Sequence, residues 1–210
     1  VLALLVGTVP VGIAGLLIDD WVETAGRSAL VIAITSIAFG LALGWADKAG
    51  AKRFELSALT LRDALLVGLA QAVALVPGTS RSGITMTAAL ALGYARPSAA
   101  RFSFLLAIPV GLLVTGWDAV KLVAGDETGR PGWLPLVVGM VAAAVSAYVV
   151  IGALLAWLRR QTMTPFVVYR LALGALLLAL IWAGVMPAAP GVDVPSPGFE
   201  APSPEAAGAG

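Results

Sequence analysis

Cysteine and histidine are both absent from this chain of 210 residues. The absence of cysteine excludes disulfides, thiolate zinc sites and cysteine nucleophiles, and the absence of histidine excludes an imidazole as general acid or base. Charged residues are also scarce: they make up 12% of the chain, and the net charge is only +1. A balance so close to neutral does not indicate nucleic acid as a partner. Any catalysis within this chain would therefore rely on hydroxyl groups, carboxylates or arginine.

Apolar residues, in contrast, are abundant. They account for 60% of the chain, and the mean hydropathy of +0.96 is far above that of an ordinary soluble domain. A helix needs about 20 apolar residues to cross a bilayer. We therefore predict an all-α, polytopic membrane helical bundle over residues 1–186, with five spans at about 1–18, 28–46, 102–120, 133–157 and 165–186.

The two ends of the chain have distinct features. The C-terminal end is unlike the membrane domain in composition, and the N-terminal end begins within an apolar segment. Residues 187–210 are rich in proline, alanine and glycine and carry no lysine or arginine, which predicts a disordered tail. The chain opens on VLALLVGTVP, with no initiator methionine and no signal-peptide pattern. We therefore expect the sequence to be truncated at its N-terminus.

Residues 64–94 form two apolar arms, and each arm is too short to span a membrane. The arms Ala64–Val76 and Ile84–Tyr94 would reach about 20 Å and 16 Å as helices, against a hydrocarbon core of about 30 Å. We predict a re-entrant hairpin, with its mouth at the cytoplasmic face and its tip near the membrane midplane. Under this topology eight basic residues share one face and three lie opposite, whereas a single crossing gives five against six. The positive-inside rule favours the hairpin.

The turn of this hairpin, VPGTSRSG, is polar where lipid-facing residues would be apolar. Gly78 and Gly83 allow the backbone to turn and to approach a ligand closely. Hydroxyl donors come from Thr79, Ser80 and Ser82, and the Arg81 guanidinium adds a planar set of N–H groups. In an alternative interpretation the serines cap the second arm and Arg81 pairs with a carboxylate or with backbone carbonyls. Because an ionised side chain at membrane depth is costly and tends to mark a functional site, we favour an anion site.

Three other polar features carry weaker signals. Asp19, Asp20 and Glu23 follow the first expected span, and we interpret them as a solvated helix end rather than a metal site. Arg170 lies a few residues into the last span, where snorkelling to the interface is favoured over a second contact to the anion. Gln71 is expected to make a polar contact between helices.

The region DALLVGLAQAVALVPGTSRSGITMTAALALGYARPSAARFSFLLAIP resembles the second signature region of the undecaprenyl pyrophosphate phosphatase family, also called the bacitracin resistance proteins. The resemblance extends to LLVGTVPVGIAGLLIDDWVE and TPFVVYRLALGALLL, and so covers about residues 1–185. It implies an enzyme of the bacterial inner membrane, built from two inverted repeats with a re-entrant hairpin each. Such an enzyme hydrolyses a C55 isoprenyl pyrophosphate to the monophosphate carrier of cell-wall synthesis.

The resemblance also implies roles for the residues of the turn. Arg81 would hold the pyrophosphate, Ser80 and Thr85 would line the same pocket as catalytic residues, and substrate binding would involve Gly78, Thr79, Ser82 and Gly83. The family's other signature, an acidic ExxxE followed by serine and histidine, has no counterpart here. That segment is implied to supply the ligands of a divalent cation, Mg or Ca, so we assign no metal ligands in this chain. We expect the chain to be catalytically incomplete.

A different class of function remains open from the residues alone. Secondary transporters also build anion sites at the membrane midplane from broken helices. A transporter or flippase for a phosphorylated lipid is therefore the alternative to a phosphatase. Oligomeric state has no signal in the sequence.

Overall fold

In the computed structural model, the residues described are 1–23, 28–124 and 133–188. This part of the chain is helical, apart from connecting turns and one isolated β-bridge. The elements, in chain order, are α1 (Leu2–Glu23), α2 (Ala29–Ala49), the short 3₁₀ helix η2 (Leu56–Ala58), α3 (Leu61–Ala72), η3 (Val73–Leu75), α4 (Arg81–Ala91), α5 (Arg96–Ala124), α6 (Trp133–Leu158) and α7 (Thr164–Trp182). The predicted all-α fold is confirmed.

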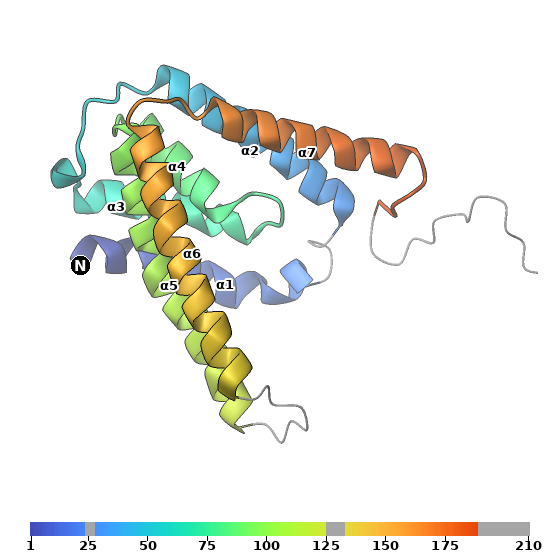
Figure 1. The fold of residues 1–210 in the computed structure, drawn as a ribbon. Coiled ribbons are helices and arrows are strands. Elements are labelled where there is room, and N and C mark those ends of the chain that lie inside the picture. The colour runs from blue at the N-terminus through green and yellow to red at the C-terminus, as the bar shows by residue number, and fades with distance from the viewer. Residues whose placement is uncertain (24–27, 125–132, 189–210) are drawn as a thin grey trace, which may run out of the picture.

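Two long antiparallel helix pairs diverge from a common end of the molecule (Figure 1). One pair is α2 with α7, and the other is α5 with α6. The shorter helices α3 and α4 lie between the pairs, and α1 packs against α3 and α5. The buried apolar core is centred on this middle layer, where α3, α4 and the first half of α5 meet. The pairs therefore frame the helical hairpin that carries the polar turn.

Three helices among the described residues are long and apolar enough to cross a membrane: α2, α6 and α7. Their bounds lie close to the expected spans 28–46, 133–157 and 165–186. The helix α1 extends from Leu2 to Glu23 and continues through Pro10. The chain is thus a membrane protein by the length and composition of these helices.

The helix α5 begins at Arg96, six residues before the expected span 102–120. Pro97 explains the difference, because proline in the first turn of a helix loses no hydrogen bond and has a backbone angle suited to the helix. The amide of Ala99 already donates to the Ala95 carbonyl at 2.9 Å.

The segment 64–94 contains two short helices joined by a turn. The helices α3 and α4 have 12 and 11 residues, which correspond to about 18 Å and 16 Å. Gly68 of α3 lies directly against the backbone of α1, because a Cβ there would approach the Gly7 carbonyl oxygen to 2.3 Å. This close approach fixes α3 against α1. The depth of the hairpin in a bilayer stays a prediction.

The two ends of the hairpin are adjacent. The amides of Arg53 and Phe54, before α3, donate to the Gly93 carbonyl after α4, and the Ala95 amide donates back to Phe54. The Tyr94 hydroxyl donates to Asp63 Oδ2 at 2.8 Å. Entry and exit of the hairpin are therefore tied together at one end of the molecule.

Three of the long helices, α2, α5 and α7, are joined at the same end of the molecule. Asp47, buried near the end of α2, accepts two hydrogen bonds from the Arg96 guanidinium at the start of α5. It also accepts from the Met163 amide, just before α7, at 3.1 Å. One carboxylate thus joins α2, α5 and α7 where the helix pairs converge.

The Tyr94 hydroxyl gives a testable signature of this arrangement. Burial, and then the hydrogen bond to the Asp63 carboxylate, raise the pKa of Tyr94 to about 12. Because the pKa in an unfolded chain is about 10, the contribution to stability is present below pH 10 and is lost as the pH rises through the folded value. The test is to titrate the tyrosinate absorbance of the wild type and of Tyr94→Phe with base. The difference between the two curves should have its midpoint near the raised pKa of Tyr94. A midpoint near the unfolded value would contradict the buried contact.

The last described residues turn back toward α2. The Ala188 carbonyl accepts from the Leu30 amide at 3.2 Å and from the Ser28 hydroxyl. The rest of the predicted tail, residues 189–210, lies outside the described residues.

Candidate functional site: a polar turn held between two membrane helices

The turn between α3 and α4 is held by hydrogen bonds to its backbone carbonyls. Thr35 of α2 donates from Oγ1 to the Pro77 carbonyl at 2.7 Å. The Gly78 carbonyl accepts from Arg170 Nη2 of α7 at 2.7 Å and from Ser36 Oγ at 3.3 Å. The turn is therefore attached to the α2–α7 pair as well as to its own arms.

Gly78 is required by both conformation and space. Its φ of +84° lies in the left-handed region that favours glycine. A Cβ at this position would lie 2.3 Å from Thr35 Oγ1 and 2.7 Å from the Ile32 carbonyl oxygen. The predicted shaping role of Gly78 thus has a physical basis, although its contact with a substrate stays a prediction.

Ser80 caps the helix that follows the turn. Its hydroxyl accepts a hydrogen bond from the Gly83 amide at 3.3 Å, as the capping interpretation of the sequence anticipated. Its φ of +66° is unusual for a residue with a side chain, and such strain costs about 1–3 kcal/mol where surrounding contacts enforce it. The side chain itself is exposed. The N-terminus of α4, with its free amides and positive dipole end, therefore opens at this point.

A cavity of about 150 Å³ lies over the N-terminus of α4. The lining residues with polar groups are Ser80, Ser82, Gly83, Tyr169 and Arg170, and the apolar wall comes from residues of α2, α4, α5, α6 and α7. No aspartate or glutamate is among the described residues that line it. The cavity therefore combines a helix N-terminus, hydroxyls and a guanidinium with no competing carboxylate, which is the chemistry of an anion site.

Arg170 points into this site, so the expectation that it snorkels to the interface is wrong. Only 9% of the residue is exposed, and its Nε has no hydrogen-bond partner among the described residues. Its Nη1 lies 3.6 Å from the position of a Cβ built on Gly83, directly over the start of α4. Arg170 forms no ion pair with a described residue. The salt bridge found among the described residues joins Arg96 and Asp47.

The sequence contains a signal for this position of Arg170 that was not used. Gly174, one turn later, packs against α2 so closely that a Cβ would lie 2.5 Å from Ile37 Cγ1. Gly40 of α2 leaves room for Arg170 itself, because a Cβ added to Gly40 would lie 3.1 Å from the Arg170 Cβ. Glycine four residues after an arginine indicates a helix face in close contact with another helix, where the arginine side chain has no lipid-facing path to the interface.

Arg81 is the first residue of α4 and is exposed. No hydrogen bond or ion pair joins its guanidinium to another described residue. Its backbone carbonyl accepts from Thr85 Oγ1 at 2.9 Å, as part of the first turn of the helix. The alternative in which Arg81 pairs with a carboxylate is therefore not seen in the described chain. Ser80 and Ser82, its neighbours in the sequence, both line the cavity, but Arg81 itself is not among the lining residues.

Thr85 and Thr79 lie apart from the cavity. Thr85 is buried between α4 and α5, where its hydroxyl contacts Ser103 Oγ, and it does not line the cavity. Thr79 is fully buried, and its Oγ1 has no hydrogen-bond partner among the described residues. The structure thus brings Ser80, Ser82, Gly83 and Arg170 together around the cavity, whereas Arg81, which lies between Ser80 and Ser82 in the sequence, does not line it. The catalytic role of Thr85 stays a prediction.

The remaining polar candidates do not join this group. Gln71 of α3 is fully buried, and neither atom of its amide has a partner in the part of the chain that is described. The expected contact between helices through this amide is thus not observed there. The side chains of Asp19, Asp20 and Glu23 lie outside the described residues.

The described residues do not fit a divalent cation. No group of three or more aspartate, glutamate, histidine or cysteine side chains comes together among them. Magnesium and calcium require several oxygen ligands, mainly carboxylates. The residues around the turn are cationic or neutral, so they are suited to an anion rather than to a metal.

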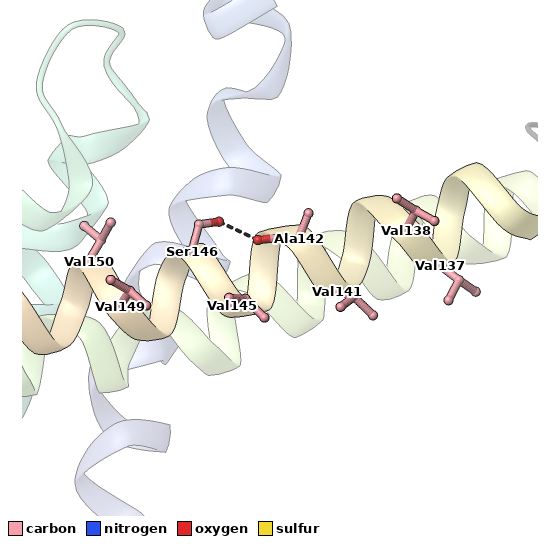
Figure 2. Close-up of a pocket in the computed structure, with 8 residues that line it drawn as sticks. All are labelled: Val137, Val138, Val141, Ala142, Val145, Ser146, Val149 and Val150. Atoms are coloured by element: carbon pink, nitrogen blue, oxygen red, sulfur yellow. Dashed lines mark hydrogen bonds between the residues drawn. The ribbon is translucent and has the colours of Figure 1, made fainter.

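A second hollow, of about 670 Å³, runs along the exposed surface of α6 (Figure 2). All the residues that line it belong to α6, and most are valine. Its one side-chain hydroxyl, from Ser146, donates to the Ala142 carbonyl of its own helix at 2.6 Å. With no free polar group, this surface is typical of a helix facing lipid, and the chemistry lies at the turn instead.

Comparison with known proteins identifies related sequences over most of the chain. The model of the family described as "Bacitracin resistance protein BacA" matches residues 1–176. The undecaprenyl-diphosphatase of Magnetococcus marinus is 53% identical over 181 residues, which are 86% of this chain and 67% of the relative. The undecaprenyl-diphosphatase of Chromohalobacter salexigens is 50% identical over 180 residues, 86% of this chain and 66% of the relative. The chain spans about two thirds of the length of these relatives.

Proposed function

Since the chain belongs to the bacitracin resistance protein BacA family, we propose that it forms the pyrophosphate-binding part of an undecaprenyl-diphosphatase. The substrate would be a long isoprenyl pyrophosphate lipid, and the product would be its monophosphate, the lipid carrier used in cell-wall synthesis. We further propose that the protein is located in the bacterial inner membrane. The names of the relatives favour hydrolysis over the transport alternative.

The observation that carries the proposal is that two arginines lie at the N-terminus of α4. Arg170 reaches the turn from α7, and Arg81 begins α4 beside the capping residue Ser80. A pyrophosphate presents several anionic oxygens, and guanidinium groups bind such oxygens through parallel N–H bonds. The apolar wall of the cavity is suited to the isoprenyl chain next to the charged group.

In this mechanism the residues of the turn bind and orient the substrate. The guanidinium groups and the free amides of α4 would stabilise negative charge that develops as the phosphoanhydride bond breaks. Hydroxyls of Ser80 and Ser82 would donate to non-bridging oxygens. The described residues at the site include no carboxylate or imidazole that could accept a proton from an attacking water or hydroxyl. We infer that this base, and the ligands of any divalent cation, come from the upstream segment of the family.

The test is phosphate release from undecaprenyl pyrophosphate in detergent, with magnesium or calcium. It compares this chain with the same chain joined to the N-terminal third of the Magnetococcus marinus relative. We expect activity only in the longer protein, and its loss on chelation of the cation. Activity of this chain alone would contradict the assignment of the base to another segment. Inactivity of both, with both folded, would contradict the proposed function.

A further inference from the structure

A second polar pocket, separate from the turn, lies where α2, α5 and α7 converge. Its volume is about 540 Å³. The wall formed by the helices is apolar at one end, from Leu41, Trp45 and Val167, and polar at the other. The polar end is lined by Asp47, Lys48, Lys52, Arg96, Thr162 and Thr164. It is lined by other residues of α7 than the anion cavity, which is lined by Met163, Phe166 and Arg170.

The polar end of this pocket carries an excess of positive charge. Its one carboxylate, Asp47, is already engaged by the Arg96 guanidinium and by the Met163 amide. The charges of Lys48 and Lys52 are left uncompensated by any described residue that lines the pocket. Lys52 Nζ donates once, to the Gly50 carbonyl at 3.3 Å, so further N–H donors are available on the ammonium group.

The loop that carries Lys52 is fixed in an unusual conformation. Lys52 has a φ of +52°, in the left-handed region that residues with side chains rarely adopt. Gly50 on one side packs against α4, where a Cβ would lie 2.2 Å from the Leu90 carbonyl oxygen. Arg53 and Phe54 on the other side are hydrogen-bonded to Gly93. These contacts hold Lys52 at the pocket and limit its freedom to turn away.

The position of the pocket along α2 favours a lipid over a soluble anion. Leu41 and Trp45 are 56% and 65% exposed on a helix that is long and apolar enough to span. Lys48 follows Trp45 by about one turn, so the boundary between apolar and charged surface crosses the pocket. Tryptophan is typical of the membrane interface, and basic pockets between membrane helices bind anionic lipid headgroups.

We propose that this pocket binds the headgroup phosphate of an anionic phospholipid. Lys48 and Lys52 contact the phosphate, and an acyl chain lies against the apolar end. The Thr164 hydroxyl, which accepts from Thr162 Oγ1 at 2.8 Å, donates its own proton to the phosphate. Such a lipid would bridge α2 and the start of α7. Binding at this pocket does not depend on the function proposed for the turn.

The experiment measures lipid binding by the purified protein in detergent. Phosphatidylglycerol and phosphatidylcholine with identical acyl chains are titrated, and the thermal midpoint and the lipid retained in native mass spectrometry are recorded. We expect selective binding of phosphatidylglycerol, and about 30-fold weaker binding in Lys48→Gln/Lys52→Gln, since each basic residue near anionic lipid contributes about 5-fold. The single variant Lys52→Gln, with about 5-fold weaker binding expected, serves if the double variant does not fold.

The matched control is Arg159→Gln/Arg160→Gln, which removes the same charge from the exposed turn just after α6. This variant should keep wild-type binding. Equal loss in both double variants would mean that only general charge attracts the lipid, and would overturn the proposal. Unchanged binding in the lysine variants would also overturn it. Stabilisation by inorganic phosphate equal to that by phosphatidylglycerol would identify a site for small anions instead.

Discussion

Replacement of Arg81 by alanine is expected to lower kcat/KM for undecaprenyl pyrophosphate about 100- to 1,000-fold, the usual cost of removing one donor that stabilises developing charge. The measurement uses the chain joined to the upstream segment of its relative. Arg81 is exposed and contacts no described carboxylate. The fold therefore has little dependence on it, and the thermal midpoint of the variant should stay close to that of the wild type.

Two comparisons separate this role from a general effect of charge. Arg62→Ala removes an exposed arginine from the first turn of α3, at the mouth of the hairpin, and should leave turnover unchanged. Arg81→Lys keeps the charge but loses the planar pair of donors, so it should also be poor. Near-normal turnover of Arg81→Ala would remove Arg81 from the proposed site.

Replacement of Arg170 by methionine is expected to affect both the turn and anion binding. The variant loses the hydrogen bond to the Gly78 carbonyl, and hydrogen bonds to charged groups contribute about 1.5–3 kcal/mol to stability. It also loses the buried guanidinium over the start of α4. We expect a lower thermal midpoint and no stabilisation of this chain by added inorganic pyrophosphate, which should stabilise the wild type.

Thr35→Val distinguishes the two roles of Arg170, because Thr35 holds the same turn through a neutral hydrogen bond to the Pro77 carbonyl. If Arg170 only held the turn, both variants would lose pyrophosphate binding to a similar degree. A role in binding the anion predicts a much larger loss in Arg170→Met. Equal stabilisation of Arg170→Met and wild type by pyrophosphate would exclude contact between Arg170 and the anion.

The fold was largely predictable because long apolar segments have few alternatives to helix in a membrane. The bounds of α2, α6 and α7 follow from the lengths of their apolar runs. The start of α5 at Arg96 was not predicted, since the expected span 102–120 was bounded by the apolar run that follows Arg101. The bidentate pair of Arg96 with Asp47 explains how the charge at 96 is accommodated within a helix that packs against its neighbours.

The local parts of the candidate site were also predictable, whereas its distant parts were not. Glycine, serine and proline in PGTSRSG specify a turn and a helix cap within a few residues of one another. The contact of Arg170 with Gly78 joins positions 92 residues apart. Hydropathy places Arg170 near a helix end but does not determine which way it faces, and the small residues Gly40 and Gly174 that determine it lie on two different helices.

Among the described residues, the hydrogen bonds from α2 and α7 reach the turn only through the carbonyl oxygens of Pro77 and Gly78. Every residue has such an oxygen, so this attachment does not depend on which side chains the turn displays. Substitution at Arg81 or Ser82 can therefore alter ligand preference while the turn stays in place, whereas Ser80 also caps α4 through its side chain. The site is open to evolutionary change in specificity without a matching change in the helices that support it.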